Sequence, residues 1–247
     1  MIHNIAHRGA SAYEPENTLR AFERAIEMGA TMLELDVHLC QDGCPVVIHD
    51  AELSRTTNDS GRVGDLTLAQ LQKLDAGKGE RIPTLAEVMY LARGRVELYI
   101  ELKGQDTPVP VVEALRTADF MDRAIVCSFY PWLIQKARFV EPALRTSMLV
   151  RGQYRRVGFV EWALAVEADY VHPCWERESP TPHKLLSPAM IADIRRRGLG
   201  IILWHEERPA ELRELVKLDV DGISTNAPDV LAGILQKETW HSVSQAQ

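Results

Sequence analysis

The feature that most constrains the fold is a series of eight short apolar runs, which alternate along the chain with segments of helical periodicity. From Ile100 onward the centres of the runs are 26, 22, 23, 31 and 21 residues apart, about the length of one strand and one helix. Without a Pro/Gly-rich linker or a shift of composition, eight such units predict a closed (β/α)8 barrel rather than a doubly wound sheet. The runs are centred near Ala6, Leu35, Ile100, Val126, Met148, Val171, Ile202 and Ile223.

One further apolar segment does not belong to the parallel series. Residues 45–49 follow Asp42-Gly43, and Asp-Gly between two apolar stretches predicts a hairpin, so this strand should run antiparallel to the preceding one. Residues 51–83 are rich in turn residues and hold one short helical pattern, at 68–74. We expect a single domain over residues 1–247, with 51–83 as a small insertion over the barrel mouth.

The bulk properties exclude several classes of protein. A net charge of -7 and a pI of about 5.7 argue against a nucleic-acid partner, which would need clustered Lys and Arg. No uninterrupted apolar stretch approaches the roughly 18 residues of a membrane span. The first residues leave no room for a secretion signal, and the four cysteines have neither metal-ribbon spacing nor the density of a disulfide framework. We therefore expect a cytoplasmic protein with reduced thiols.

Ionisable residues end several of the apolar runs. Burying such groups at strand ends is costly unless they serve a site, and in a barrel the carboxyl ends of the strands meet at one mouth. Together these residues supply three carboxylates, two histidines, an arginine and a lysine, a set suited to metal-assisted chemistry on a phosphate ester. They are His7, Arg8, Glu34, Asp36, His49, Glu101 and Lys103.

The carboxylates predict a metal site. Glu34 and Asp36 are two residues apart on one strand, so they point to the same face, and Glu101 comes from the next parallel strand. Oxygen ligands favour Mg²⁺ or Ca²⁺ over softer metals, and the residue types do not decide between the two ions. The alternative is structural ion pairing of the carboxylates with Arg8 or Lys103.

The histidines and the cations suit acid/base chemistry on a phosphate. His7 and His49 can exchange protons near neutral pH, although either histidine alone could be a core residue. Arg8 and Lys103 could bind phosphate oxygens. Trp204 ends a late strand and could pack against a bound substrate, line the mouth or pack in the core.

Two further features remain open at this level. Glu16 and Asn17 could orient residues of the site, or they could cap the helix that follows them. Ser128 could face the site.

Several motifs occur in an order that resembles the glycerophosphodiester phosphodiesterase family. The resemblance covers nearly the whole chain, although residues 130–199 match only as barrel scaffold. The motifs are His-Arg-Gly (7–9), Pro-Glu-Asn-Thr (15–18), Glu-Leu-Asp-Val (34–37), Gln-Asp-Gly (41–43), His-Asp (49–50), Arg-Thr-Thr (55–57), Ile-Glu-Leu-Lys (100–103), Ser-Phe (128–129) and Val-Asp-Gly-Ile-Ser-Thr-Asn-Ala-Pro-Asp (220–229).

The resemblance implies a (β/α)8 barrel that hydrolyses glycerophosphodiesters to sn-glycerol 3-phosphate and an alcohol. By this resemblance one divalent cation is held by Glu34, Asp36 and Glu101, and the phosphate is bound by Arg8 and Lys103. His7 and His49 are the implied acid/base pair, with His7 as the initial base. The implied route passes through a cyclic phosphate, formed by the glycerol 2-hydroxyl and then opened by water.

Two departures from the family pattern concern the head-group preference. Asn226 stands where relatives often have aspartate, and His205-Glu206-Glu207 replaces a small polar residue followed by asparagine. The same barrel could also act as a cyclising phosphodiesterase or as a lysophospholipase D. A scaffold that only binds phosphate compounds is disfavoured, because every expected histidine and metal ligand is present.

Overall fold

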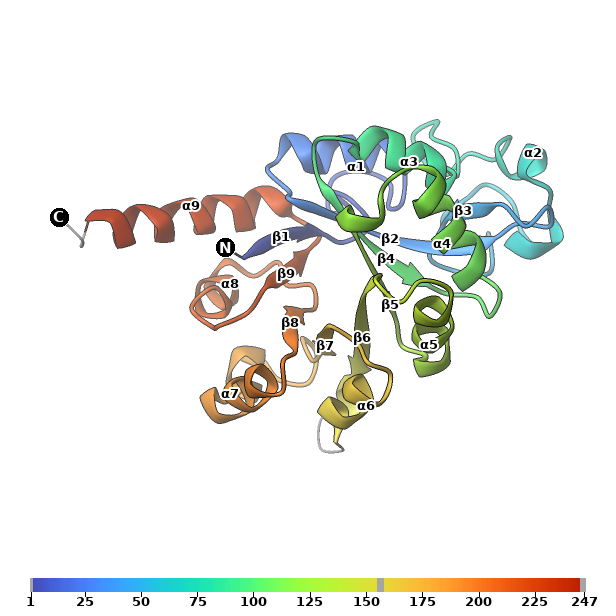
Figure 1. The fold of residues 1–247 in the computed structure, drawn as a ribbon. Helices are drawn as coiled ribbons and strands as arrows, with labels where there is room; N and C mark the ends of the chain where they lie inside the picture. Colours follow the sequence, from blue (N-terminus) through green and yellow to red (C-terminus); the bar gives the residue numbers. More distant parts are fainter. Residues whose placement is uncertain (1, 155–157, 245–247) are drawn as a thin grey trace.

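The structure is a computed structural model that describes residues 2–154 and 158–244. Its sheet contains eight parallel strands that close on themselves, because β1 pairs with both β2 and β9. Figure 1 shows the strands inside a ring of helices. The predicted (β/α)8 barrel is therefore confirmed. Its strands are β1 (His3–Ala6), β2 (Met32–Leu39), β4 (Glu97–Leu102), β5 (Ala124–Ser128), β6 (Arg145–Arg151), β7 (Tyr170–Cys174), β8 (Gly200–Leu203) and β9 (Gly222–Thr225).

Several helices begin at a capping side chain or at a proline. The hydroxyls of Thr18, Thr84 and Ser187 each accept a backbone N–H of the helix that follows, which satisfies a donor left free by the first turn. Four helices have a proline in the first turn, where its missing N–H would have had no partner within the helix. The helices are α1 (Leu19–Glu27), α2 (Leu68–Leu71), α3 (Leu85–Ala92), α4 (Pro108–Thr117), α5 (Pro131–Val140), α6 (Phe159–Ala165), α7 (Pro188–Arg196), α8 (Pro209–Leu215) and α9 (Pro228–Ser244).

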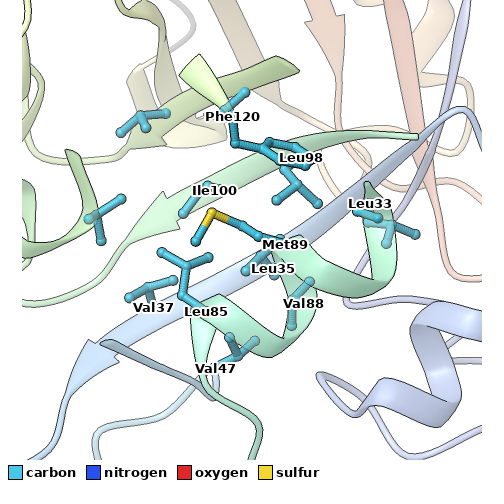
Figure 2. Packing of buried hydrophobic residues seen from close by; sticks show 14 of the residues in the cluster. Leu33, Leu35, Val37, Val47, Leu85, Val88, Met89, Leu98, Ile100 and Phe120 are labelled. Atoms are coloured by element: carbon cyan, nitrogen blue, oxygen red, sulfur yellow. The ribbon is translucent and has the colours of Figure 1, made fainter. Parts of the chain in front are cut away.

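Alternation along the strands separates an outer core from the barrel interior. Leu33, Leu35 and Val37 of β2 point outward and pack with α3, whose Val88 and Met89 lie against them (Figure 2). Burial of these apolar side chains holds the helix on the barrel wall. The intervening residues of the same strand must therefore point inward.

The lower part of the interior is filled by apolar side chains. One buried cluster joins residues from six strands, among them Ile5, Met32, Ile125 and Ile202. Above Met32 along β2, the inward positions are Glu34 and Asp36. The apolar layer thus closes the barrel below these carboxylates, which lie at its carboxyl-terminal end.

The segment after β2 departs from the barrel repeat. The strand β3 (Pro45–Val47) pairs antiparallel with β2, which confirms the predicted hairpin. Residues 51–83 include a bridge between Glu52 and Arg62, and Leu53 and Val63 pack in a small apolar cluster beside β3. The single-domain organisation of residues 1–247 stays a prediction. None of the helices in the described ranges is long and apolar enough to cross a membrane.

Candidate active site

Three carboxylates meet at the carboxyl end of neighbouring strands. Asp36 on β2 is directly opposite Glu101 on β4 in the strand register, and Glu34 lies two residues before Asp36. One oxygen from each side chain lies within 4.8 Å of the others, and all three residues are at most 5 % exposed. The predicted cluster is therefore formed by side chains that two adjacent strands orient inward.

The turn after β1 is shaped around this cluster. Arg8 has a φ of 56° and Gly9 a φ of 82°, both in the left-handed region that side chains avoid. The turn aims the backbone N–H of Arg8 at Glu34 Oε2, 2.8 Å away. Strain of this kind is retained where surrounding contacts fix it, and here the contact is made to a cluster carboxylate.

Asn17 and Glu16 settle a question that the sequence left open. Thr18, not Asn17, caps α1. Asn17 is buried with a φ of 58°, and its Nδ2 donates to Asp36 Oδ2 at 2.8 Å. Glu16 receives Arg8 Nη1 at 3.0 Å. Both residues therefore orient groups of the site instead of capping the helix.

The ionisation of the carboxylates reflects their burial and their mutual repulsion. Burial, reinforced by the charge of Asp36, raises the pKa of Glu34 well above its usual range. Burial also raises the pKa of Glu101 to about 7 in spite of the adjacent Lys103. For Asp36 burial acts in the same direction, but the charges of Lys103 and Arg8 outweigh it and hold its pKa below the usual range.

These observations fit a hard divalent cation. The donor set consists of three carboxylate oxygens that lie within 4.8 Å of one another, on side chains that are almost fully buried. A cation between the carboxylates would remove the repulsion that raises the pKa of Glu34. The residues present are therefore suited to hold Mg²⁺ or Ca²⁺.

Both predicted phosphate-binding cations lie against the cluster. Lys103 Nζ is 3.0 Å from Asp36 Oδ1 and 2.6 Å from Glu101 Oε1. Arg8 Nε is 3.3 Å from Asp36 Oδ2. The ion pairs considered in the sequence analysis are thus present, and they place two positive charges beside the carboxylates.

His7 lies on the β8–β9 side of the cluster. Its Nδ1 is 2.7 Å from Asn226 Oδ1, and its ring stacks on His205 with centroids 4.7 Å apart. Burial, together with the charges of Arg8 and His205, lowers the pKa of His7 well below 6.5. Trp204 contributes a wall, with its ring centroid 5.6 Å from that of His7.

The residues that depart from the family pattern have distinct contacts in this region. His205 stacks on His7, as described above. Glu207 Oε1 accepts the backbone N–H of Asn226 at 3.3 Å. Glu206 binds the Arg208 guanidinium and backbone N–H groups of its own loop, so its role is to hold the loop.

His49 lies in a different setting, after β3. Its Nδ1 is 2.6 Å from Asp50 Oδ1, and Asp50 is in turn paired with Arg55. The Arg55 guanidinium also donates to both oxygens of Glu16. His49 is 30 % exposed, and burial lowers its pKa in spite of the nearby Asp36.

A cavity of about 510 Å³ opens beside His49. Glu101 and Lys103 line this cavity. Ser128 is not among its lining residues, and its hydroxyl donates to the backbone carbonyl of Leu102. The sequence analysis did not predict several residues that line this cavity. One of them is His38, although it continues the two-residue alternation of Glu34 and Asp36. The lining residues of the cavity are His38, His49, Asp50, Ala51, Glu52, Ser54, Arg55, Glu101, Lys103, Phe129, Tyr130 and Arg151.

A closed parallel barrel with buried carboxylates, two histidines and two cations at its mouth defines a hydrolase for phosphate esters. Residues 7–230 match the model of the glycerophosphoryl diester phosphodiesterase family. The chain belongs to this family, and it is therefore a phosphoric diester hydrolase that cleaves glycerophosphodiesters. The resemblance noted from the motifs is confirmed.

Individual relatives agree with this assignment. A glycerophosphodiester phosphodiesterase of Caldanaerobacter subterraneus subsp. tengcongensis is 36 % identical, in an alignment that covers 94 % of this chain and 97 % of the relative. The crystal structure of a glycerophosphodiester phosphodiesterase from Agrobacterium tumefaciens is 30 % identical, with a TM-score of 0.82 over 94 % of this chain and all of that one. An Oleispira antarctica phosphodiesterase, solved with the product sn-glycerol-3-phosphate, is 26 % identical with a TM-score of 0.83, over 94 % of this chain and 96 % of that one.

Proposed function

We propose that the protein hydrolyses glycerophosphodiesters to sn-glycerol 3-phosphate and an alcohol in a reaction that needs one divalent cation, Mg²⁺ or Ca²⁺. The observation that carries the metal dependence is the buried cluster of Glu34, Asp36 and Glu101, whose carboxylates would be the metal ligands. When bound, the cation would stabilise negative charge on the phosphoryl oxygens. Arg8 and Lys103, which both pair with Asp36, would bind the phosphate.

His7 acts as the initial base in this proposal. With Nδ1 engaged by the amide oxygen of Asn226, Nε2 is left to take the proton of the glycerol 2-hydroxyl. The lowered pKa of His7 keeps the ring neutral, as a base must be. The hydroxyl then attacks phosphorus and forms a cyclic phosphate. Trp204, close to His7, packs against the glycerol.

His49 acts as the initial acid. Its Nδ1 is bonded to the Asp50 carboxylate, which favours the protonated ring against the burial that lowers its pKa, and Nε2 is left to give a proton to the departing alcohol. Water opens the cyclic phosphate with the two roles exchanged. The route therefore places the glycerol on the His7 side of the carboxylates and the leaving alcohol on the His49 side.

Two alternatives use the same barrel. A lysophospholipase D would need room for an acyl chain on the glycerol, which lies on the His7 side. An apolar groove of about 450 Å³ shares Phe129, Tyr130 and Arg151 with the His49 cavity, which takes the leaving alcohol in this proposal. An acyl chain on the glycerol would extend from the His7 side, so this groove is no argument for a lysophospholipase D. Arrest at the cyclic phosphate would be seen as a cyclic product.

The expected cytoplasmic location stays a prediction, consistent with four free cysteines.

The test is release of glycerol 3-phosphate from glycerophosphocholine and glycerophosphoethanolamine, with Mg²⁺, with Ca²⁺ and with a chelator. We expect release that the chelator abolishes and that His7→Ala and Glu34→Ala each lower by about 10²–10⁴. His3→Ala, a histidine at the opposite end of β1, is the matched control and should retain full activity. Chelator-resistant release, or full activity in either site variant, would contradict the proposal.

A further inference from the structure

The cavity beside His49 is lined by three basic side chains whose charges are balanced differently. Lys103 is paired with two carboxylates of the cluster, and Arg55 is paired with Asp50 and Glu16. The third is Arg151, which forms no ion pair with a carboxylate of residues 2–154 or 158–244. Positive charge at this wall is therefore left for a bound molecule.

Arg151 is held against the wall of the cavity. It is the last residue of β6, and its guanidinium carbon lies 4.9 Å from the centroid of the Phe129 ring. Stacking on an aromatic face restricts the side chain while leaving its N–H donors free to bind. The remaining acidic residue of the wall, Glu52, is paired with Arg62 at 3.3 Å and does not reach Arg151.

The position of Arg151 relative to the reaction follows from the proposed function, on which this inference rests. His49 and Arg151 line the same cavity, and His49 gives its proton to the leaving alcohol. The leaving alcohol therefore lies in this cavity, within reach of the wall that carries Arg151. At about 510 Å³ the cavity has room for a head group of the size of an amino alcohol.

We propose that Arg151 binds an oxyanion on the leaving alcohol, a carboxylate or a phosphate, and so makes the enzyme prefer glycerophosphodiesters whose head group carries one. A guanidinium presents two parallel N–H donors that match the two oxygens of such a group. A quaternary ammonium head group gains nothing from this wall, because the free charge there has the same sign. Arg151 is thus a specificity-determining residue.

Two substrates that differ by a single carboxylate test the inference. Glycerophosphoserine is glycerophosphoethanolamine with a carboxylate added to its head group, so the ratio of their kcat/KM values isolates the contribution of that group. We expect a serine-to-ethanolamine ratio of at least about 10 for the wild type, because hydrogen bonds between charged groups are worth roughly that factor or more. The ratio should fall toward 1 in Arg151→Gln and should be partly kept in Arg151→Lys.

Arg177→Gln is the matched control, because Arg177 is an exposed arginine that follows β7 and does not line the cavity. It should leave the ratio as in the wild type. A wild-type ratio near 1, or a fall of both kcat/KM values by the same factor in Arg151→Gln, would overturn the inference while the proposed function stands. A wild type that hydrolyses neither diester would overturn the proposed function and this inference with it.

Discussion

The two histidines of the site differ in the chemical group to which they are hydrogen-bonded. His7 is bonded to the amide oxygen of Asn226 and is 6 % exposed. His49 is bonded to the carboxylate of Asp50 and is 30 % exposed. A carboxylate stabilises an imidazolium far more than an amide does. This difference gives a physical reason for assigning the base to His7 and the acid to His49.

The pH dependence of kcat/KM should report the ionisation of His7. Burial and then the charges of Arg8 and His205 lower its pKa well below 6.5, so the base stays neutral as the pH falls from 7 through 6.5. We expect kcat/KM to show no decline over that range and to fall only at lower pH, when the His7 ring takes a proton. The profile is measured with saturating metal. A decline that begins above pH 6.5 would contradict the assignment.

Asn226→Asp tests the cause of this behaviour. The substitution replaces the amide by a carboxylate 2.7 Å from His7 Nδ1. An opposite charge at this distance raises the pKa of an imidazole by about 1–3 units, so the acidic limb of the profile should move to higher pH by that amount. Asn58→Asp, in the insertion, is the control that adds the same charge away from His7. An unmoved limb in Asn226→Asp would show that His7 is not the group that titrates.

At the scale of elements, the turn between β1 and α1 links the barrel to the site. A Cβ on Gly9 would lie 2.7 Å from the backbone carbonyl carbon of Ala21, which belongs to the buried face of α1. Gly9 therefore allows both the left-handed backbone and the close approach of the helix. The same turn presents the N–H of Arg8 to Glu34, so a shift here would reach the carboxylate cluster.

Gly9→Ala should be strongly destabilising. The strained φ and the contact with backbone atoms together predict a loss of about 2–4 kcal/mol, or roughly 5–15 °C in Tm. Gly43→Ala is the matched control, because Gly43 has a similar φ of 75° but nothing within 4 Å of the added methyl. It should cost only about 1 kcal/mol. Equal losses in both variants, measured by thermal unfolding, would show that the packing against Ala21 is not tight.

The cluster could be predicted from the sequence because its geometry follows from strand periodicity. Glu34 and Asp36 share a face by alternation, and the neighbouring strand brings Glu101 opposite Asp36. The partners of Asn17 and Arg151 could not be predicted in the same way. Asn17 bonds Asp36 across a turn with positive φ. Arg151, at the end of β6, stacks on Phe129, which follows the neighbouring strand β5. Both contacts depend on how loops and strand ends meet in space.

For the whole molecule, the buried carboxylates link stability to pH and to metal. Burial raises the pKa of Glu101 to about 7 and that of Glu34 well above 4.5, whereas in the unfolded chain both groups titrate near 4.5. Without metal the folded state therefore binds more protons than the unfolded state. The contribution of these two groups to stability is then present at acidic pH and is lost as the pH rises through about 7.

A divalent cation should reverse this loss, because it binds the ionised carboxylates of the folded protein and displaces their protons. At a concentration one hundred times its Kd, the metal stabilises the fold by about 2.7 kcal/mol, which corresponds to roughly 5–10 °C in Tm. We expect the rise in Tm to be larger at pH 8 than at pH 5.5 and to be reversed by a chelator. Glu34→Gln should remove most of the rise, whereas Glu23→Gln, at an exposed ion pair with Arg95, should keep it. Because the readout is thermal unfolding and not activity, an equal rise in Glu34→Gln would refute metal binding at this cluster even if the enzyme were active.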